Sequence, residues 1–246
     1  MAPREKIAIL PMGATEQHGP HLPPETDWII AEAVATRAKT QVEEKLAIDV
    51  LPVEKTGYSI EHSHDPRTLT LGFEEAAGRW IGIGERLRRQ GIRKFVMLNA
   101  HGGNSPLMIV VATELRVRRG MLAVATSWTR FGHPPDLVSA EERALGIHGG
   151  FIETSVMLAL RPDLVKMDKA RDFPSEQARF ARAFTHLRAY GPHAFGWMMQ
   201  DLSPEGVVGN AAAATPEAGE KLLEHAVSGF VELLMDVDRF DLAALR

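Results

Sequence analysis

Carboxylates and imidazoles are concentrated in one short stretch of the chain, residues 15–27, which reads TEQHGPHLPPETD. Its glycine and three prolines predict a shaped loop rather than a helix or a strand. Burying so many polar groups without partners costs free energy. A divalent metal ion would satisfy them, because it accepts neutral imidazole and ionised carboxylate as ligands. The alternative is a solvated polar loop, and this stretch alone leaves both interpretations open.

Four side chains have the types and spacing of metal ligands. Glu16 and His18 lie two residues apart, so they could face neighbouring metals or two sides of one. Asp27 stands at the start of the helical pattern that follows, where its carboxylate could bridge two cations. His101 ends a predicted strand, and the glycines after it allow the backbone to approach closely. A two-metal centre needs such a set: a bridging carboxylate, flanking His and Glu ligands, and a water between the ions.

A second group of polar residues lies in the segment 147–155, IHGGFIETS. His148 is a candidate proton donor, because histidine titrates near neutral pH. Glu153 opens an apolar helical pattern, so it could either stabilise the helix dipole or belong to a site, and the pattern favours neither role. Ser105 and Ser155 do not lie in the Gly-x-Ser-x-Gly turn of a nucleophilic serine.

Apolar runs alternate with helical periodicity along the first half of the chain. The runs at 6–12, 47–53, 94–99 and 121–128 predict strands, and the patterns from Trp28, at 73–89, 107–119, 153–160 and 216–238 predict helices. This alternation indicates right-handed βαβ units and a mainly parallel sheet. The loops that begin at Thr15, Gly57 and Ala100 should then meet at one edge of the sheet, where such folds bind ligands.

The remaining segments have weaker patterns. Residues 134–150 read as irregular, residues 163–190 as charged and amphipathic, and residues 190–210 as an ordered loop rich in glycine, proline and aromatics. In the loop 59–70, His62 and His64 could line a pocket, but a polar loop is the simpler interpretation. His193 and Trp197 are interpreted as packing or rim residues.

Composition narrows the class of protein. The chain has 246 residues, 45% of them hydrophobic, which suits one large α/β domain over residues 1–246. The net charge of -4 gives no basic surface for nucleic acid. The chain has no cysteine, so any metal must be held by His, Asp and Glu. No apolar run has the length of a signal peptide or membrane span, which predicts a soluble cytoplasmic protein.

Several separated motifs, in the same order, resemble the creatininase (creatinine amidohydrolase) family. They are LPMGATEQHGPHLPPETD at 10–27, HDPRTLTL at 64–71, LNAHGGNS at 98–105 and HGGFIETSVMLALRPDL at 148–164, with a weaker match, GNAAAATPEAGEKLL, at 209–223. The resemblance implies a three-layer αβα sandwich around a mainly parallel sheet. It also implies a dinuclear Zn, Mn or Fe centre, hydrolysis of a non-peptide C–N bond, and a homo-oligomer, commonly a hexamer.

The resemblance also implies roles for individual residues. Glu16, His18, Asp27 and His101 fall on the metal ligands of the family, with Asp27 as the bridge, and His148 falls on a histidine near the substrate. Glu153 matches the glutamate of the shared ETS segment and is assigned as a further ligand. His64 and Asn104, which stand in two of the motifs, are assigned as candidate substrate-binding residues.

The chain departs from creatininase at three positions and from many relatives at a fourth. Gly103 stands where creatininase has a metal-binding glutamate, Ile147 where it has another glutamate, and Ala144 where it has a tryptophan that stacks on the substrate. Many relatives carry glutamate where this chain has Phe151. The lost ligand could be replaced by Glu153, by water or by nothing, and hydrolysis of creatinine itself is not expected.

These observations predict a metal-dependent amidohydrolase with about two divalent ions per chain, acting on a small cyclic amide or formamide. A metal-activated water would attack, and His148 would pass a proton to the leaving nitrogen. Two alternatives stay open. One is a deformylase or peptide-cleaving member of the family in cofactor biosynthesis, and the other is a catalytically silent homologue that binds metal or ligand.

Overall fold

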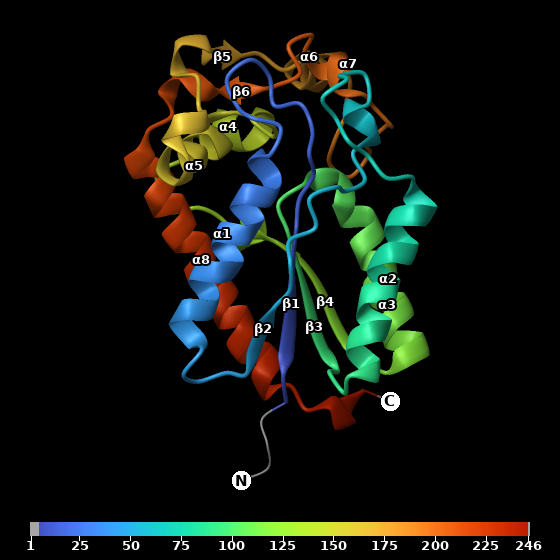
Figure 1. The fold of residues 1–246 in the computed structure, drawn as a ribbon. Helices are drawn as coiled ribbons and strands as arrows, with labels where there is room; N and C mark the ends of the chain where they lie inside the picture. The colour runs from blue at the N-terminus through green and yellow to red at the C-terminus, as the bar shows by residue number, and fades with distance from the viewer. Residues whose placement is uncertain (1–4, 246) are drawn as a thin grey trace.

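The computed structural model describes residues 5–245 and contains a four-stranded parallel sheet between two layers of helices (Figure 1). The strand order is β2-β1-β3-β4, and all three pairings are parallel. The strands are β1 (Ile7–Met12), β2 (Ile48–Val50), β3 (Lys94–Asn99) and β4 (Leu122–Ser127). The predicted αβα sandwich around a mainly parallel sheet is therefore confirmed.

Each face of the sheet is buried under its own helices. Helices α1 (Thr26–Val42), α5 (Phe151–Leu160) and α8 (Pro216–Arg239) cover one face, and α2 (Phe73–Arg89) and α3 (Ser105–Arg119) cover the other (Figure 1). Alternate residues of a strand point to opposite faces. Ile7 and Ile9 of β1 accordingly lie in the first core, and Ala8 and Leu10 lie in the second.

The order of the strands creates a switch point between β1 and β3. From β1 the chain passes through α1 to β2 on one side, then returns through α2 to β3 on the other side of β1. Loops that leave neighbouring strands in opposite directions open a crevice at their carboxyl ends, where open α/β sheets bind ligands. The loops after Met12 and Asn99, which carry Glu16, His18 and His101, start at this point.

Apart from α5, the segments between residues 139 and 215 lie above the carboxyl ends of the strands (Figure 1). They contain α4 (Ala140–Leu145), β5 (Asp172–Phe173), α6 (Gln177–Ala183), α7 (Met199–Leu202) and β6 (Gly209–Asn210), with β5 and β6 antiparallel. The expectation that residues 134–150 are irregular was wrong for Ala140–Leu145, which form α4, and holds for the rest of the segment. The N-terminus of α4 is capped by the Ser139 hydroxyl, which accepts the N–H of Glu142.

Other predicted boundaries differ by a few residues. Strand β2 is shorter than the predicted 47–53, since it pairs only with β1 over three residues and Pro52 offers no N–H. Helix α5 begins at Phe151, two residues before the predicted start. Among the described helices, none is long and apolar enough to cross a membrane.

Candidate metal centre

The loop after β1 fixes the orientation of the His18 ring. Its Nδ1–H donates to the backbone carbonyl of Glu16 at 3.1 Å, because a carbonyl can only accept. In the neutral ring, the other nitrogen, Nε2, carries the lone pair. It faces Asp27 Oδ1 at 3.2 Å and Glu153 Oε2 at 3.7 Å. His18 therefore presents a ligand nitrogen to two carboxylates.

His101, after β3, is oriented in the same way but through its opposite nitrogen. Its Nε2–H donates to the carbonyl of Tyr58 at 2.9 Å. This leaves Nδ1 facing Glu16 Oε2 at 3.0 Å and Asp27 Oδ2 at 3.4 Å. A hydrogen bond from the outer ring nitrogen to a carbonyl is the usual way in which proteins orient a metal-ligating histidine.

Asp27 lies between these two imidazoles, in the first turn of α1. Its two oxygens face different histidines, as a bridging carboxylate requires. Asp27 and Glu16 are each only 1% exposed, and among the described residues neither Asp27 Oδ2 nor His18 Nε2 has a hydrogen-bond partner. Unpartnered buried polar atoms of this kind are costly, and a cation fits both.

Three sets of possible ligand atoms overlap at this place, each set lying within 4.8 Å. The first set is Glu16, Asp27 and His101, the second is His18, Asp27 and Glu153, and the third is Glu16, His18 and His148. Glu16, His18 and Asp27 each belong to two of these sets. Nitrogen and carboxylate oxygen donors without sulfur suit Zn, Mn or Fe. The structure thus brings all five predicted ligands together.

Proton affinities in the cluster are displaced in the directions that buried ion pairs produce. Burial would raise the pKa of Glu16, but His101 and His62 hold it well below its usual value. Burial lowers the pKa of His18, but Asp27 raises it overall to about 9. His101 likewise has a raised pKa, against the effect of burial, because Glu16 and Asp27 favour its charged form. The site therefore attracts positive charge, whether protons or a metal ion.

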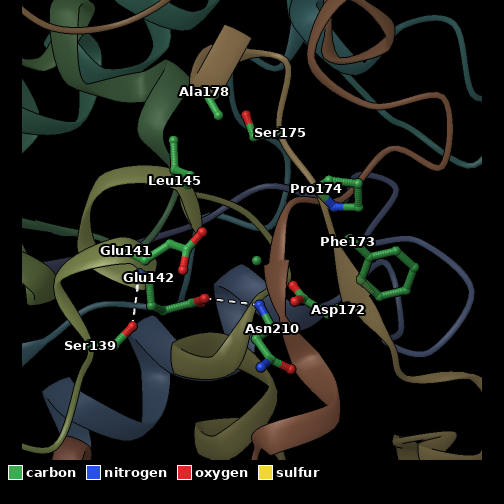
Figure 2. Close-up of a pocket in the computed structure, with 11 residues that line it drawn as sticks. Ser139, Glu141, Glu142, Leu145, Asp172, Phe173, Pro174, Ser175, Ala178 and Asn210 are labelled. Carbon is green, nitrogen blue, oxygen red and sulfur yellow. Dashed lines mark hydrogen bonds between the residues drawn. The ribbon is translucent and has the colours of Figure 1, made fainter. Parts of the chain in front are cut away.

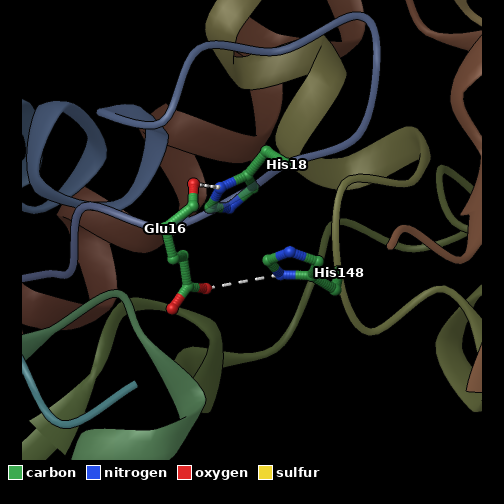
Figure 3. Close-up of side chains that lie close together, drawn as sticks. All are labelled: Glu16, His18 and His148. Carbon is green, nitrogen blue, oxygen red and sulfur yellow. Dashed lines mark hydrogen bonds and ion pairs between the residues drawn. The ribbon is translucent and has the colours of Figure 1, made fainter. Parts of the chain in front are cut away.

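His148 lies beside Glu16 and His18 (Figure 3). Its Nε2–H donates to the carbonyl of Gln17 at 2.8 Å, and its Nδ1 is 3.6 Å from Glu16 Oε1. Burial and the neighbouring charge of His18 hold its pKa well below the usual value. His148 is thus a neutral imidazole with a lone pair on Nδ1. It must accept a proton before it can donate one.

The loop 59–70 contributes a histidine to the cluster, but this is His62 and not the predicted His64. His62 is buried, its Nε2 lies 3.5 Å from Glu16 Oε1, and its ring centroid is 4.3 Å from that of His148. Sequence reasoning assigned His62 to a polar loop. In the same loop the Ser59 hydroxyl donates to Glu16 Oε2.

Neither predicted substrate-binding residue lies at the cluster. His64 is exposed and is not among the residues that line the adjoining cavity. Asn104 is buried, and its amide nitrogen donates to Gly13 O and Asn99 Oδ1, both at 3.0 Å, while its oxygen accepts the N–H of Tyr58. Its side chain ties Gly13, Tyr58 and the end of β3 together, and both of its amide hydrogens are used within the protein.

A cavity of about 450 Å³ opens beside Glu16 and His101. Its polar residues are Glu16, Glu61, His62, His101 and His148, and its apolar wall includes Pro106, Ile147, Tyr190, Phe195 and Trp197. Trp197, which the sequence suggested as packing or rim, thus lines the cavity. Glu61 lies on the outer side of His101, with Oε1 at 3.5 Å from Nε2.

Glu153 is the least enclosed of the predicted ligands. It accepts the N–H of Gly149 at 2.7 Å, and 14% of its side chain is exposed. Burial raises its pKa to about 7. It lines a separate cavity of about 270 Å³ together with Trp128, Arg143 and Ile152. Both roles left open by the sequence are compatible with this position at the start of α5.

A further buried carboxylate, Glu142, lies outside the cluster and has a different environment (Figure 2). Its two oxygens accept the N–H groups of Phe151 at 2.7 Å and Asn210 at 2.9 Å. It borders a third cavity, of about 340 Å³. Because Glu142 joins α4, α5 and β6 through satisfied hydrogen bonds, we interpret it as structural.

Comparison with known proteins gives one consistent result over nearly the whole chain. The family model for creatininase (creatinine amidohydrolase) matches residues 1–234. The creatinine amidohydrolase of Pseudomonas putida is 31% identical over 247 residues, covering 94% of this chain and 89% of that protein. The mycofactocin precursor peptide peptidase of Mycolicibacterium smegmatis is 29% identical over 225 residues, with 91% and 82% covered. The solved structure of a manganese creatininase has a TM-score of 0.75 at 28% identity and covers 94% of this chain and 91% of that chain.

Proposed function

The chain belongs to the creatininase family, and from this premise we propose that it is a metal-dependent amidohydrolase acting on a small cyclic amide or formamide. One observation carries the proposal. The two oxygens of buried Asp27 face two imidazole nitrogens whose tautomers are fixed by backbone carbonyls. Structural carboxylates such as Glu142 accept N–H groups instead, so the arrangement around Asp27 favours a cation.

The residues divide into ligands and a proton carrier. We propose that Glu16, His101 and Asp27 hold one divalent ion and that His18, Glu153 and Asp27 hold a second, with Zn, Mn or Fe as the candidates. Such ions polarise a carbonyl and lower the pKa of a water molecule.

We propose that His148 moves the proton. As a water oxygen bonds to the substrate carbon, His148 Nδ1 takes a proton from that water and delivers it to the nitrogen of the breaking C–N bond. Its low pKa keeps Nδ1 unprotonated at neutral pH, ready to accept. Its hydrogen bond to Gln17 O holds the ring while the proton moves.

The size of the cavity is also compatible with the peptide-cleaving alternative. A volume of about 450 Å³ exceeds what a five-membered ring fills, and the wall formed by Tyr190, Phe195 and Trp197 could hold the side chain of a peptide residue. A single functional unit over residues 1–246, a homo-oligomer and a cytoplasmic location stay predictions from the sequence.

Elemental analysis of the purified protein, followed by turnover assays with added Zn or Mn, tests the proposal. We expect about two ions per chain and hydrolysis of at least one member of a panel of cyclic amides, formamides and dipeptides. Cleavage of only the dipeptides would favour the peptidase alternative. A chain that binds no ion after Zn or Mn is supplied would refute the mechanism and favour the silent homologue.

A further inference from the structure

The lining of the cavity of about 450 Å³ includes acidic side chains. Of the described residues that line it, none is Lys or Arg, whereas Glu16 and Glu61 both carry carboxylates. Glu16 lies among the proposed metal ligands, so its negative charge would be balanced by a metal ion. Glu61 is outside all three sets of possible ligand atoms, and its charge faces the cavity.

The position of Glu61 is built into the local structure. It lies in a short 3-10 helix, Ile60–His62, and one of its oxygens is 3.5 Å from His101 Nε2. That nitrogen points away from the proposed metal side, which is at Nδ1. Gly103 leaves the necessary space, because a Cβ there would come within 2.4 Å of Glu61 Oε1.

Aromatic residues complete this part of the cavity. Tyr190, Phe195 and Trp197 line it together with Glu61, and 15% of the Glu61 side chain is exposed. A cavity lined by both a carboxylate and aromatic side chains can bind a guanidinium or ammonium group, through charge-assisted hydrogen bonds and cation–π contact. An anionic substrate would find no lysine or arginine on this wall.

We propose that Glu61 is a specificity residue that selects amides carrying a cationic guanidinium or ammonium group, which it binds against the wall formed by Tyr190, Phe195 and Trp197. The inference names the substrate class for the site under the proposed function and rests on that function. Glu61 holds the cationic group, while the amide reaches toward Glu16 and His101.

Two ligands of the same shape test the inference without turnover. Butylguanidinium and butylurea differ in charge but hardly in size, and their dissociation constants are measured by calorimetry on the metal-loaded protein. We expect the wild-type protein to bind butylguanidinium about 10 to 100 times more tightly, as a hydrogen bond to a charged group does. In E61Q this ratio should fall to near one, with the metal content unchanged.

Two further variants separate the effect of the Glu61 charge from the effect of the overall charge of the protein. E141Q removes a charge from an exposed residue that lines the cavity of about 340 Å³, so the ratio should stay at the wild-type value. E61K should exclude butylguanidinium and favour pentanoate. Equal affinities in the wild-type protein, or a ratio that E61Q leaves unchanged, would overturn the inference.

The same measurement distinguishes this inference from the proposed function. A protein that discriminates between the two ligands but hydrolyses no amide would keep Glu61 as a cation-binding residue and refute the hydrolase. A protein that hydrolyses neutral amides and binds both ligands equally would support the hydrolase and refute the role of Glu61.

Discussion

The two halves of the candidate metal centre share Asp27 but differ in how firmly their other residues are held. On one side, Glu16 and His101 are 1% and 4% exposed, and both are fixed by neighbours: Ser59 donates to Glu16, and His101 donates to Tyr58 O. On the other side, Glu153 is more exposed, lies 3.7 Å from His18 Nε2 and has a pKa raised to about 7.

The two halves also face different spaces. Glu16 and His101 border the cavity of about 450 Å³ with the aromatic wall, whereas Glu153 borders the separate cavity of about 270 Å³. The residues of the first half are therefore held in place and face the proposed substrate, whereas Glu153 in the second half is less enclosed. We therefore expect the first half to bind metal more tightly and the second to depend on Glu153.

Removing the shared carboxylate should have the largest effect. In Asp27→Asn we expect both ions to be lost and amide hydrolysis to fall at least about a thousandfold, since each half loses a charged ligand. Elemental analysis and kcat/KM measure the two effects. Asp163→Asn, at an exposed residue paired with Arg161, is the matched control and should retain both. Full metal content in Asp27→Asn would show that Asp27 does not bridge.

Glu153→Gln and Glu16→Gln should separate the halves. Glutamine at 153 can still accept the N–H of Gly149, so only the charge facing His18 is lost. We expect about one ion per chain in this variant, with ligand binding in the large cavity retained. Glu16→Gln should weaken the ion on the cavity side and, with it, substrate binding. Metal content and KM measured together check this, and the same loss in both variants would refute two distinct halves.

The pH dependence of stability should also report the looser half. In metal-free protein, folding raises the pKa of His18 from 6.5 to about 9 and that of Glu153 from 4.5 to about 7. At these two groups the folded state binds more protons than the unfolded chain, so the His18 contribution is full below pH 6.5 and is lost as the pH rises through 9. The Glu153 contribution is full below pH 4.5 and is lost as the pH rises through 7.

Metal should oppose this trend, because it takes the place of the proton on His18. We expect the Tm of metal-free protein to fall between pH 7 and 9, above the range in which the lowered pKa of His148 opposes the trend, and the increase in Tm on adding Zn to be larger at pH 9 than at pH 7. Thermal unfolding with and without chelator at three pH values measures both. A Tm of metal-free protein that rises over this pH range would contradict the proton assignments.

The sequence predicted the first half of the centre better than its surroundings. Strand β3 was predicted with its correct bounds, and the rule that strand ends meet placed His101 near Glu16 and Asp27. This succeeded because Glu16 and His101 follow soon after buried strands, whose positions depend on local hydrophobic pattern.

Residues in the longer loops could not be assigned in the same way. The sequence pattern of the loop 59–70 is the same whether His62 or His64 points inward, and only packing against Glu16 and His148 decides it. Asn104 looks like a site residue after a strand, yet its hydrogen bonds go to Gly13, Asn99 and Tyr58. The wall at 190–197 lies far along the chain from the loops it faces, so no local periodicity indicates it.

The smallest expected effect concerns how firmly the first half is held. Ser59→Ala removes the hydroxyl that donates to Glu16 Oε2 and leaves every proposed ligand in place. Loss of such an outer partner typically weakens metal affinity about tenfold to a hundredfold, and we expect the lower end because His101 still faces the same oxygen. Metal titration against a chelator should show weakening of the tighter ion only. If the weaker ion is affected instead, the half formed by Glu16 and His101 binds the weaker ion, and the order of the two affinities inferred from burial is reversed.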